Sequence, residues 1–171
     1  MKRSRSVSLS LFIISMTLFS FCSKKDKSAP EETKTGVTVQ FDGKTWVYEK
    51  ASAFAGNDFF AVEWELMENG TNLYGSVSWV EPGTGKREWN MDNQFYWYPE
   101  GYNAELSYHS YWKGGDDAEW STGSVEITKW GNVGEVVEGT FTIPNSGGYQ
   151  GTSATYIGTK EIKGSFRVIR K

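Results

Sequence analysis

The sequence contains one cysteine and one histidine, and these shortages exclude several kinds of site. A single cysteine forms neither an internal disulfide framework nor a cysteine-rich metal site. A single histidine excludes a zinc site built from two or three histidines. A folded domain in this chain must therefore rely on its apolar core.

Basic residues are scarce relative to acidic ones. The chain has 18 Lys and Arg against 21 Asp and Glu, a formal net charge of −3. Attraction to the phosphate backbone requires an excess of positive charge. The composition therefore argues against a nucleic-acid partner.

Long apolar runs are missing as well. The run Val7–Phe21 holds about 15 residues, whereas a helix needs about 20 to cross a bilayer. Basic residues at positions 2, 3 and 5 precede it, and Cys22 follows at once. This order is typical of a secretory signal, so residues 1–21 are predicted to be a signal peptide.

The segment around Cys22 resembles the lipobox of bacterial lipoproteins. The resemblance implies that Cys22 becomes the first mature residue and carries the lipid, with palmitate among its acyl groups. The segment departs from the usual pattern at Phe19, where leucine is common, and at Phe21, where a small residue is common. Ordinary cleavage that releases a secreted protein stays open as the alternative.

Residues 22–35 are polar and charged without apolar periodicity, which predicts a disordered tether. Lys24, by resemblance to enterobacterial sorting rules, favours lipid anchoring in the outer membrane, on either its periplasmic or its surface face. The remaining part has 11 basic against 18 acidic side chains, a net charge of −7. Lipid, rather than surface charge, would therefore hold the protein at the membrane.

Two short turns fix the registers of two hairpins in the rest of the chain. Asp42-Gly43 opposes Val39 to Trp46 and Val37 to Tyr48. Asn69-Gly70 places four residue pairs on one apolar face, namely Leu66–Leu73, Trp64–Gly75, Val62–Val77 and Phe60–Trp79. The opposite face is mostly polar, as a half-buried hairpin requires.

A third hairpin is predicted around Glu100-Gly101-Tyr102-Asn103. A four-residue loop opposes Trp97 to Leu106, Phe95 to Tyr108 and Met91 to Trp112, which keeps one face apolar. Further strands are expected at Ser124–Trp130, Glu135–Ile143, Ala154–Ile157 and Ile162–Ile169. Asn145-Ser146-Gly147-Gly148 is predicted to begin a mobile loop.

This pattern gives about nine or ten short strands built from hairpins. Such spacing is typical of an all-β antiparallel β-sandwich, with a β-barrel as the alternative. Residues 36–171 are predicted to form a single β domain, aromatic-rich and with many glycine turns. The strands at its two ends are expected to close the fold.

The C-terminal residues carry a recognisable pattern. It consists of Ile127-Thr128-Lys129-Trp130-Gly131, Glu138-Gly139-Thr140-Phe141 and Gly164-Ser165-Phe166-Arg167-Val168. This pattern resembles the ending of uncharacterised lipoproteins of Bacteroidota and spirochaetes. The resemblance covers about 45 residues and supports the compartment and the fold, without implying an activity.

The residues offer little for catalysis, and we expect no catalytic residue, metal or cofactor. No G-x-S-x-G turn accompanies His109, which is expected to be a half-exposed strand residue. Glu63 and Glu65 share one strand face and match two solvated glutamates better than a glycosidase pair. Asp116, Asp117 and Glu119 could supply oxygen ligands to calcium, but a solvated acidic turn is the simpler interpretation.

The unusual feature is a surplus of aromatic residues on the polar face of the third hairpin. Tyr96, Tyr98, His109 and Tyr111 form this candidate binding face. Tyrosine rings suit sugar rings and protein interfaces alike. The hypothesis is a non-catalytic, lipid-anchored envelope module that binds a glycan or a protein. The alternatives are a purely structural lipoprotein and a small carboxylate-based hydrolase.

Overall fold

The computed structural model describes residues 34–68, 71–101, 106–112, 119–151 and 153–171. Within these ranges the chain forms strands and turns and contains no helix, so none that could span a membrane. The strands are β1 Gly36–Phe41, β2 Lys44–Tyr48, β3 Lys50–Ala55, β4 Phe60–Glu68, β5 Thr71–Trp79, β6 Gly85–Glu88, β7 Gln94–Tyr98, β8 Leu106–His109, β9 Ser124–Lys129, β10 Val136–Gln150 and β11 Thr155–Arg170. The predicted all-β class is confirmed.

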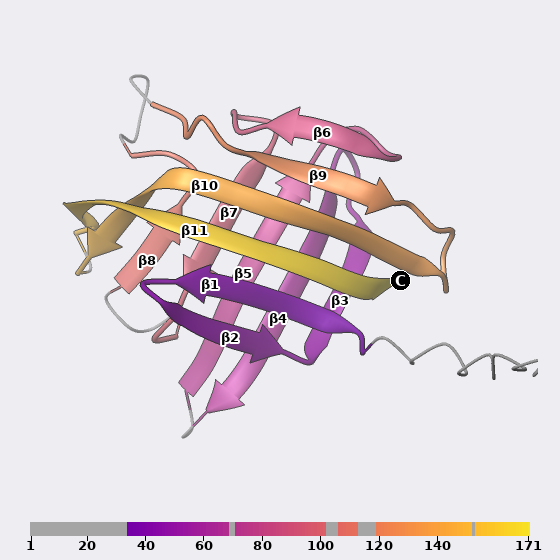
Figure 1. The fold of residues 1–171 in the computed structure, drawn as a ribbon, viewed down its shortest axis with the longest axis horizontal. Helices are drawn as coiled ribbons and strands as arrows, with labels where there is room; N and C mark the ends of the chain where they lie inside the picture. Colours follow the sequence, from indigo (N-terminus) through magenta and orange to yellow (C-terminus); the bar gives the residue numbers. More distant parts are fainter. Residues whose placement is uncertain (1–33, 69–70, 102–105, 113–118, 152) are drawn as a thin grey trace, which may run out of the picture. The chain divides into compact units, whose positions relative to one another are not determined.

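The eleven strands belong to one mixed sheet with the order β2-β1-β11-β3-β4-β5-β7-β8-β10-β9-β6, and β11 also pairs with β10. Figure 1 shows two layers whose strands cross steeply. One layer contains β2, β1, β11, β10, β9 and β6, and the other contains β3, β4, β5, β7 and β8. The arrangement is compatible with the predicted sandwich and with its barrel-like alternative.

The two layers are connected by hydrogen-bonded pairing at two corners. At one corner β11 runs parallel to β3, with Ile169 opposite Ser52. At the other, the end of β10 pairs with β8, with Gly147 opposite His109. Seven strands thus form a closed circuit of pairings, from β11 through β3, β4, β5, β7, β8 and β10 back to β11.

Strand β10 makes the second corner by bending. Its register against β11 shifts between Ile143 and Ser146, and Pro144 lies within this irregularity. A proline has no N–H for a sheet hydrogen bond, so it suits a bulge. The prediction of a mobile loop at Asn145–Gly148 is wrong, because residues 146–148 are buried within this strand. Gly147, one of the two glycines that suggested a loop, is required here by close packing.

The core lies between the layers and is dominated by large aromatic side chains. Its fully buried members include Trp64, Trp79, Trp97, Tyr48, Phe95 and Phe141. Trp64 and Phe141, from opposite layers, stack with 6.1 Å between ring centroids. Burial of each such side chain contributes about 1.5–3 kcal/mol relative to exposure. Trp97 also donates a 2.8 Å hydrogen bond to the Tyr48 hydroxyl.

The first two predicted hairpins are confirmed in their registers. Val39 lies opposite Trp46 across β1 and β2. All four apolar pairs of the second hairpin occur across β4 and β5. A methyl group on Gly75 would lie 2.3 Å from the Trp64 indole, so this glycine leaves the space that the indole fills. The predicted closure of the ends is also confirmed, since Val37 pairs with Phe166.

The third hairpin forms with a register two residues away from the predicted one. Trp97 lies opposite Tyr108, and Tyr96 lies opposite His109. A shift of two residues keeps every side chain on its predicted face. The pairing of Met91 with Trp112 is wrong, because Met91 lies outside β7 and is 77% exposed. Strands β3 and β6 were not predicted.

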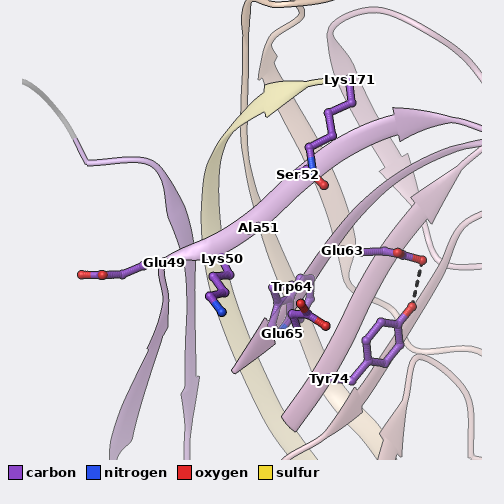
Figure 2. A pocket seen from close by; sticks show the side chains of 9 residues that line it. All are labelled: Glu49, Lys50, Ala51, Ser52, Glu63, Trp64, Glu65, Tyr74 and Lys171. Atoms are coloured by element: carbon purple, nitrogen blue, oxygen red, sulfur yellow. Dashed lines mark hydrogen bonds between the residues drawn. The ribbon is translucent and has the colours of Figure 1, made fainter. Parts of the chain in front are cut away.

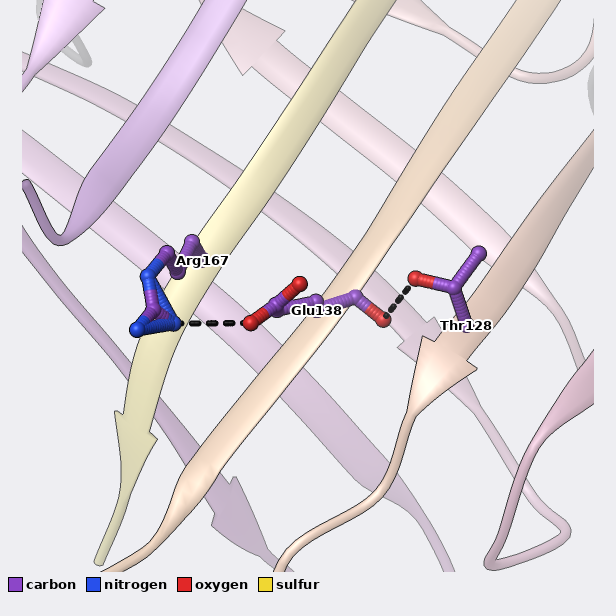
Figure 3. A network of polar contacts seen from close by, with 3 residues as sticks. All are labelled: Thr128, Glu138 and Arg167. Carbon is purple, nitrogen blue, oxygen red and sulfur yellow. Dashed lines mark hydrogen bonds and ion pairs between the residues drawn. The ribbon is translucent and has the colours of Figure 1, made fainter. Parts of the chain in front are cut away.

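An ion pair lies on the outer surface of the layer that contains β9, β10 and β11. Arg167 of β11 lies opposite Glu138 of β10, with 2.7 Å between Arg167 Nη1 and Glu138 Oε1. The Thr128 hydroxyl donates a 3.2 Å hydrogen bond to the Glu138 carbonyl oxygen. Figure 3 shows this chain of contacts across β9, β10 and β11. These three strands carry much of the C-terminal sequence pattern.

The predicted signal peptide and Cys22 lie outside the described residues, as does the predicted tether up to residue 33. Lys34 and Thr35 are exposed and precede the first strand. Strand β1 begins at Gly36, the residue at which the β domain was predicted to start.

Candidate functional site

The outer face of the β3-β4-β5-β7-β8 layer carries two rows of side chains that run across the strands. Cross-strand pairs define the first row from Ser52 through Glu63, Ser76 and Tyr96 to His109. Alternate residues of a strand point to the same side of a sheet. Since Trp64, Val77 and Trp97 fill the core, the residues of this row face outward.

A second row runs beside the first, two residues along each strand. It comprises Lys50, Glu65, Tyr74 and Tyr98 in successive cross-strand pairs. Beyond the hairpin, Tyr149 of β10 lies opposite Ser107 of β8. The outer face therefore changes from charged side chains over β3 and β4 to tyrosines over β7, β8 and β10.

The three predicted tyrosines come together around His109, the fourth predicted face residue, and Tyr149 joins them. We call Tyr96, Tyr98, His109, Tyr111 and Tyr149 the tyrosine cluster. The centroid of the imidazole lies 5.0 Å from that of Tyr96, 5.0 Å from Tyr111, 5.1 Å from Tyr149 and 6.4 Å from Tyr98. Three separate strands and the segment after β8 thus build one aromatic surface.

The rings of the tyrosine cluster do not form a flat platform. Tyr96 meets His109 at an interplanar angle of 89°, and Tyr149 meets His109 at 85°. Edge-to-face contact is the favoured arrangement of aromatic rings, because the positive edge of one meets the negative face of the next. The four tyrosines are each partly buried, so the surface is textured and retains contact with solvent.

His109 is more buried than the sequence suggested. Only 9% of its surface is exposed, so the expectation of a half-exposed residue is wrong. The surrounding tyrosines cause this burial, which lowers the pKa of the imidazole to about 4. Nε2 lies 2.9 Å from the Ser107 hydroxyl, and Nδ1 has no hydrogen-bond partner among the described residues. His109 is therefore a neutral ring with one uncommitted nitrogen.

The tyrosine hydroxyls are also held in their neutral form. Burial raises the pKa of Tyr96 and of Tyr149 to about 12. The Tyr149 hydroxyl is buried and has no hydrogen-bond partner within the described part of the chain. Buried polar groups normally have partners, and neither this hydroxyl nor His109 Nδ1 has one among the described residues.

Tyr149 was missed by sequence reasoning because the preceding glycines suggested a loop. Gly147 is required by packing instead, since a methyl group there would lie 2.1 Å from the Tyr111 carbonyl oxygen. The glycine therefore lets the Tyr111 segment cross close to β10. Tyr156, opposite Tyr149 on β11, extends the aromatic surface with a centroid separation of 5.8 Å.

A shallow hollow of about 510 Å³ opens over β3 and β4 on the same outer face. Figure 2 shows the side chains that line it, including Lys50, Ser52, Glu63, Glu65, Tyr74 and Lys171. The Tyr74 hydroxyl donates a 2.8 Å hydrogen bond to Glu63 Oε1. Burial, followed by this bond to the carboxylate, raises the pKa of Tyr74. The two glutamates that the sequence placed on one face thus both line a concave site.

The acidic turn considered for calcium is only partly within the described residues. Asp116 and Asp117 lie outside them. Glu119 accepts a 2.8 Å hydrogen bond from the Trp112 indole. In the part of the chain that the structure describes, no group of three or more His, Cys, Asp and Glu side chains is placed to hold a metal ion.

Comparison of the chain with protein-family models, with curated proteins and with solved structures found no match.

Proposed function

We propose that this protein is a non-catalytic glycan-binding module of the bacterial envelope, exported by its signal peptide and anchored through lipid on Cys22. The single observation that carries the binding function is the tyrosine cluster around His109. It gathers four partly exposed phenol rings on an outer sheet face, away from the core.

The chemistry of the cluster suits a sugar ring. The C–H groups on one face of a sugar are attracted to the negative face of an aromatic ring. Sugar hydroxyls both donate and accept hydrogen bonds, as do the phenol hydroxyls of partly exposed tyrosines. A site of this kind combines apolar contact with a few polar groups that fix orientation.

The anchoring part of the proposal depends on the sequence pattern before residue 23. A single acyl chain binds a membrane reversibly, whereas several hold a protein stably. The net charge of −7 on residues 36–171 gives no attraction to anionic lipid. Resemblance to uncharacterised lipoproteins of Bacteroidota and spirochaetes supports the same compartment.

A small hydrolase is a second candidate, because Glu63 and Glu65 both line the hollow. Glycosidases cleave with two carboxyl groups that flank the bond. The Tyr74 hydroxyl occupies one oxygen of Glu63, which favours a binding role for this pair. Incubation with oligosaccharides, followed by product analysis, distinguishes the two functions. Release of reducing ends by the wild type, together with no release by Glu63→Gln, would establish the hydrolase.

The test of the proposed function is titration of the mature lipidated chain, in detergent, with cello-, xylo- and manno-oligosaccharides. We expect saturable binding that weakens at least tenfold in Tyr96→Ala and in Tyr149→Ala, about 1.4 kcal/mol. Val47→Ala changes an exposed residue of β2 and serves as a control that leaves binding unchanged. Circular dichroism checks that each variant folds. Absence of saturable binding across all three series would favour the purely structural alternative.

A further inference from the structure

The hollow and the tyrosine cluster are parts of one continuous surface. Tyr74 lines the hollow, and its ring lies 6.3 Å from that of Tyr98 in the cluster. Between them, Ser76 presents a small side chain on the outer face, opposite both Glu63 and Tyr96. No large side chain of these two rows separates the hollow from the cluster.

The hollow contains charged side chains that are not committed to one another. Lys50 lies directly opposite Glu65 in the register of β3 and β4. Even so, the described residues include no ion pair within 4.0 Å and no side-chain hydrogen bond for Lys50, Glu65 or Lys171. In Figure 2 the Lys171 side chain extends toward Ser52, while Glu49 points away from the other lining residues. These groups are available to a ligand.

The side chains that line the hollow include both cationic and anionic groups. Two lysines, Lys50 and Lys171, stand against three glutamates, Glu49, Glu63 and Glu65, and Glu49 points away from the others in Figure 2. A site for an anion needs an excess of cationic groups, which this hollow does not have. A mixed set of ammonium donors and carboxylate acceptors instead suits hydroxyl groups, which donate and accept.

We infer that the hollow over β3 and β4 is a second sugar subsite, and that the ligand is an uncharged oligosaccharide lying across the strands from the hollow to the tyrosine cluster. The inference rests on the proposed glycan-binding function and extends it. From β3 across β4, β5, β7 and β8 to β10 there are five inter-strand spacings, roughly 24 Å at about 4.8 Å each. Such a span accommodates several linked sugar units.

The affinity of the full mature chain for cello-, xylo- and manno-oligosaccharides of one to six units tests this inference. In the series that binds, we expect affinity to rise at least tenfold between the shortest binding sugar and the six-unit chain. Lys50→Ala and Glu65→Gln should lower the affinity for the six-unit chain at least fivefold and leave the affinity for the shortest binding sugar unchanged. Oligogalacturonate, whose units carry carboxylates, should bind at least tenfold more weakly than the neutral chain.

Matched variants separate failure of the inference from failure of the proposed function. Lys44→Ala, which changes a lysine on β2, should bind sugars as the wild type does. Tyr149→Ala should lower the affinity for short and long sugars alike. Equal affinity for short and long chains would overturn the second subsite, and so would unchanged binding in both hollow variants. In either case, weaker binding in Tyr149→Ala would still support the tyrosine cluster as a sugar site. Unchanged sugar binding in Tyr149→Ala would overturn the proposed function itself.

Discussion

His109 and Tyr96 lie opposite each other on β8 and β7, and their rings meet edge to face with 5.0 Å between centroids. This contact places the single histidine of the chain among phenol rings on the outer face of a sheet, where a polar side chain ordinarily meets water. The histidine therefore stays neutral at physiological pH.

The first prediction concerns the pH dependence of stability. The unfolded chain takes up a proton on His109 near pH 6.5, whereas the folded protein does so only near pH 4. The contribution of the neutral imidazole to the free energy of unfolding is therefore complete above pH 6.5 and is lost as the pH falls toward 4. The free energy of unfolding should decrease by about 3 kcal/mol at most over this range. Denaturant unfolding of wild type and His109→Gln between pH 3.5 and 7.5 measures this difference.

The difference between the two proteins isolates His109 from the carboxylates, which titrate in both. Its resonance is also unambiguous in NMR, because the chain has one histidine. An imidazole that titrates near pH 6.5 in the folded protein would contradict the prediction.

The second prediction concerns the hydrogen bond between Trp97 and Tyr48. In Tyr48→Phe the buried Trp97 N–H loses its 2.8 Å acceptor. An unsatisfied buried donor costs about 1–3 kcal/mol, so the free energy of unfolding should fall by that amount. Urea denaturation measures it. Tyr156→Phe, at a residue that is 47% exposed, is the matched control and should change stability by less than about 0.5 kcal/mol.

The third prediction concerns Gly147, where β10 passes under the Tyr111 segment. A methyl group there would lie 2.1 Å from the Tyr111 carbonyl oxygen and 2.8 Å from Trp112 Cα, both backbone atoms. Gly147→Ala must shift one backbone segment, at a cost of about 1–3 kcal/mol. We expect lower stability in thermal unfolding and weaker sugar binding, because Tyr111 moves. Thr159→Ala, opposite Gly147 on β11, should change neither.

The fourth prediction concerns the ion pair between Glu138 and Arg167. Their side chains are 37% and 29% exposed, so water screens the attraction. Glu138→Gln should lower the free energy of unfolding by about 0.2–1 kcal/mol at low salt and by less in 1 M NaCl. Glu161→Gln removes the more exposed pair with Lys163 and should have a smaller effect. A salt-independent loss in Glu138→Gln would show that the contribution is not electrostatic.

The hairpins show where sequence alone suffices. Asn69-Gly70 predicts a two-residue turn, and the pairs of β4 and β5 have the register that this prediction implies. The turn after Tyr98 has no such constraint, and the predicted register was wrong by two residues. The faces were nonetheless right, because side chains alternate with period two and an even shift preserves them.

Two strands escaped prediction for physical reasons. The inward residues of β3 are Ala51 and Ala53, which are too small to mark an apolar face. This strand is held instead by backbone pairing with β4, the next strand along the chain, and by parallel pairing with β11, which is distant in sequence. Strand β6 reads GKRE and pairs with β9 alone, so hydrogen bonds at an edge define it.

The candidate site was partly accessible from the sequence. Tyr96, Tyr98, His109 and Tyr111 lie within one predicted hairpin, so local periodicity was enough to group them. Tyr149 and the hollow were not accessible, since the first requires a bent β10 and the second requires β3 beside β4. The first depends on packing between distant segments, and the second depends on a strand that its small residues did not reveal.

The bend in β10 also governs the order in which the protein assembles. The hairpin of β4 and β5 joins neighbours in the chain, whereas Gly147 must find His109 across 37 intervening residues. Contacts of large sequence separation require costly loop closure and slow the folding of β proteins. The tyrosine cluster is therefore completed only when β10 docks on β8, a step that the β4-β5 hairpin does not need. A ligand held there would stabilise this docked state selectively.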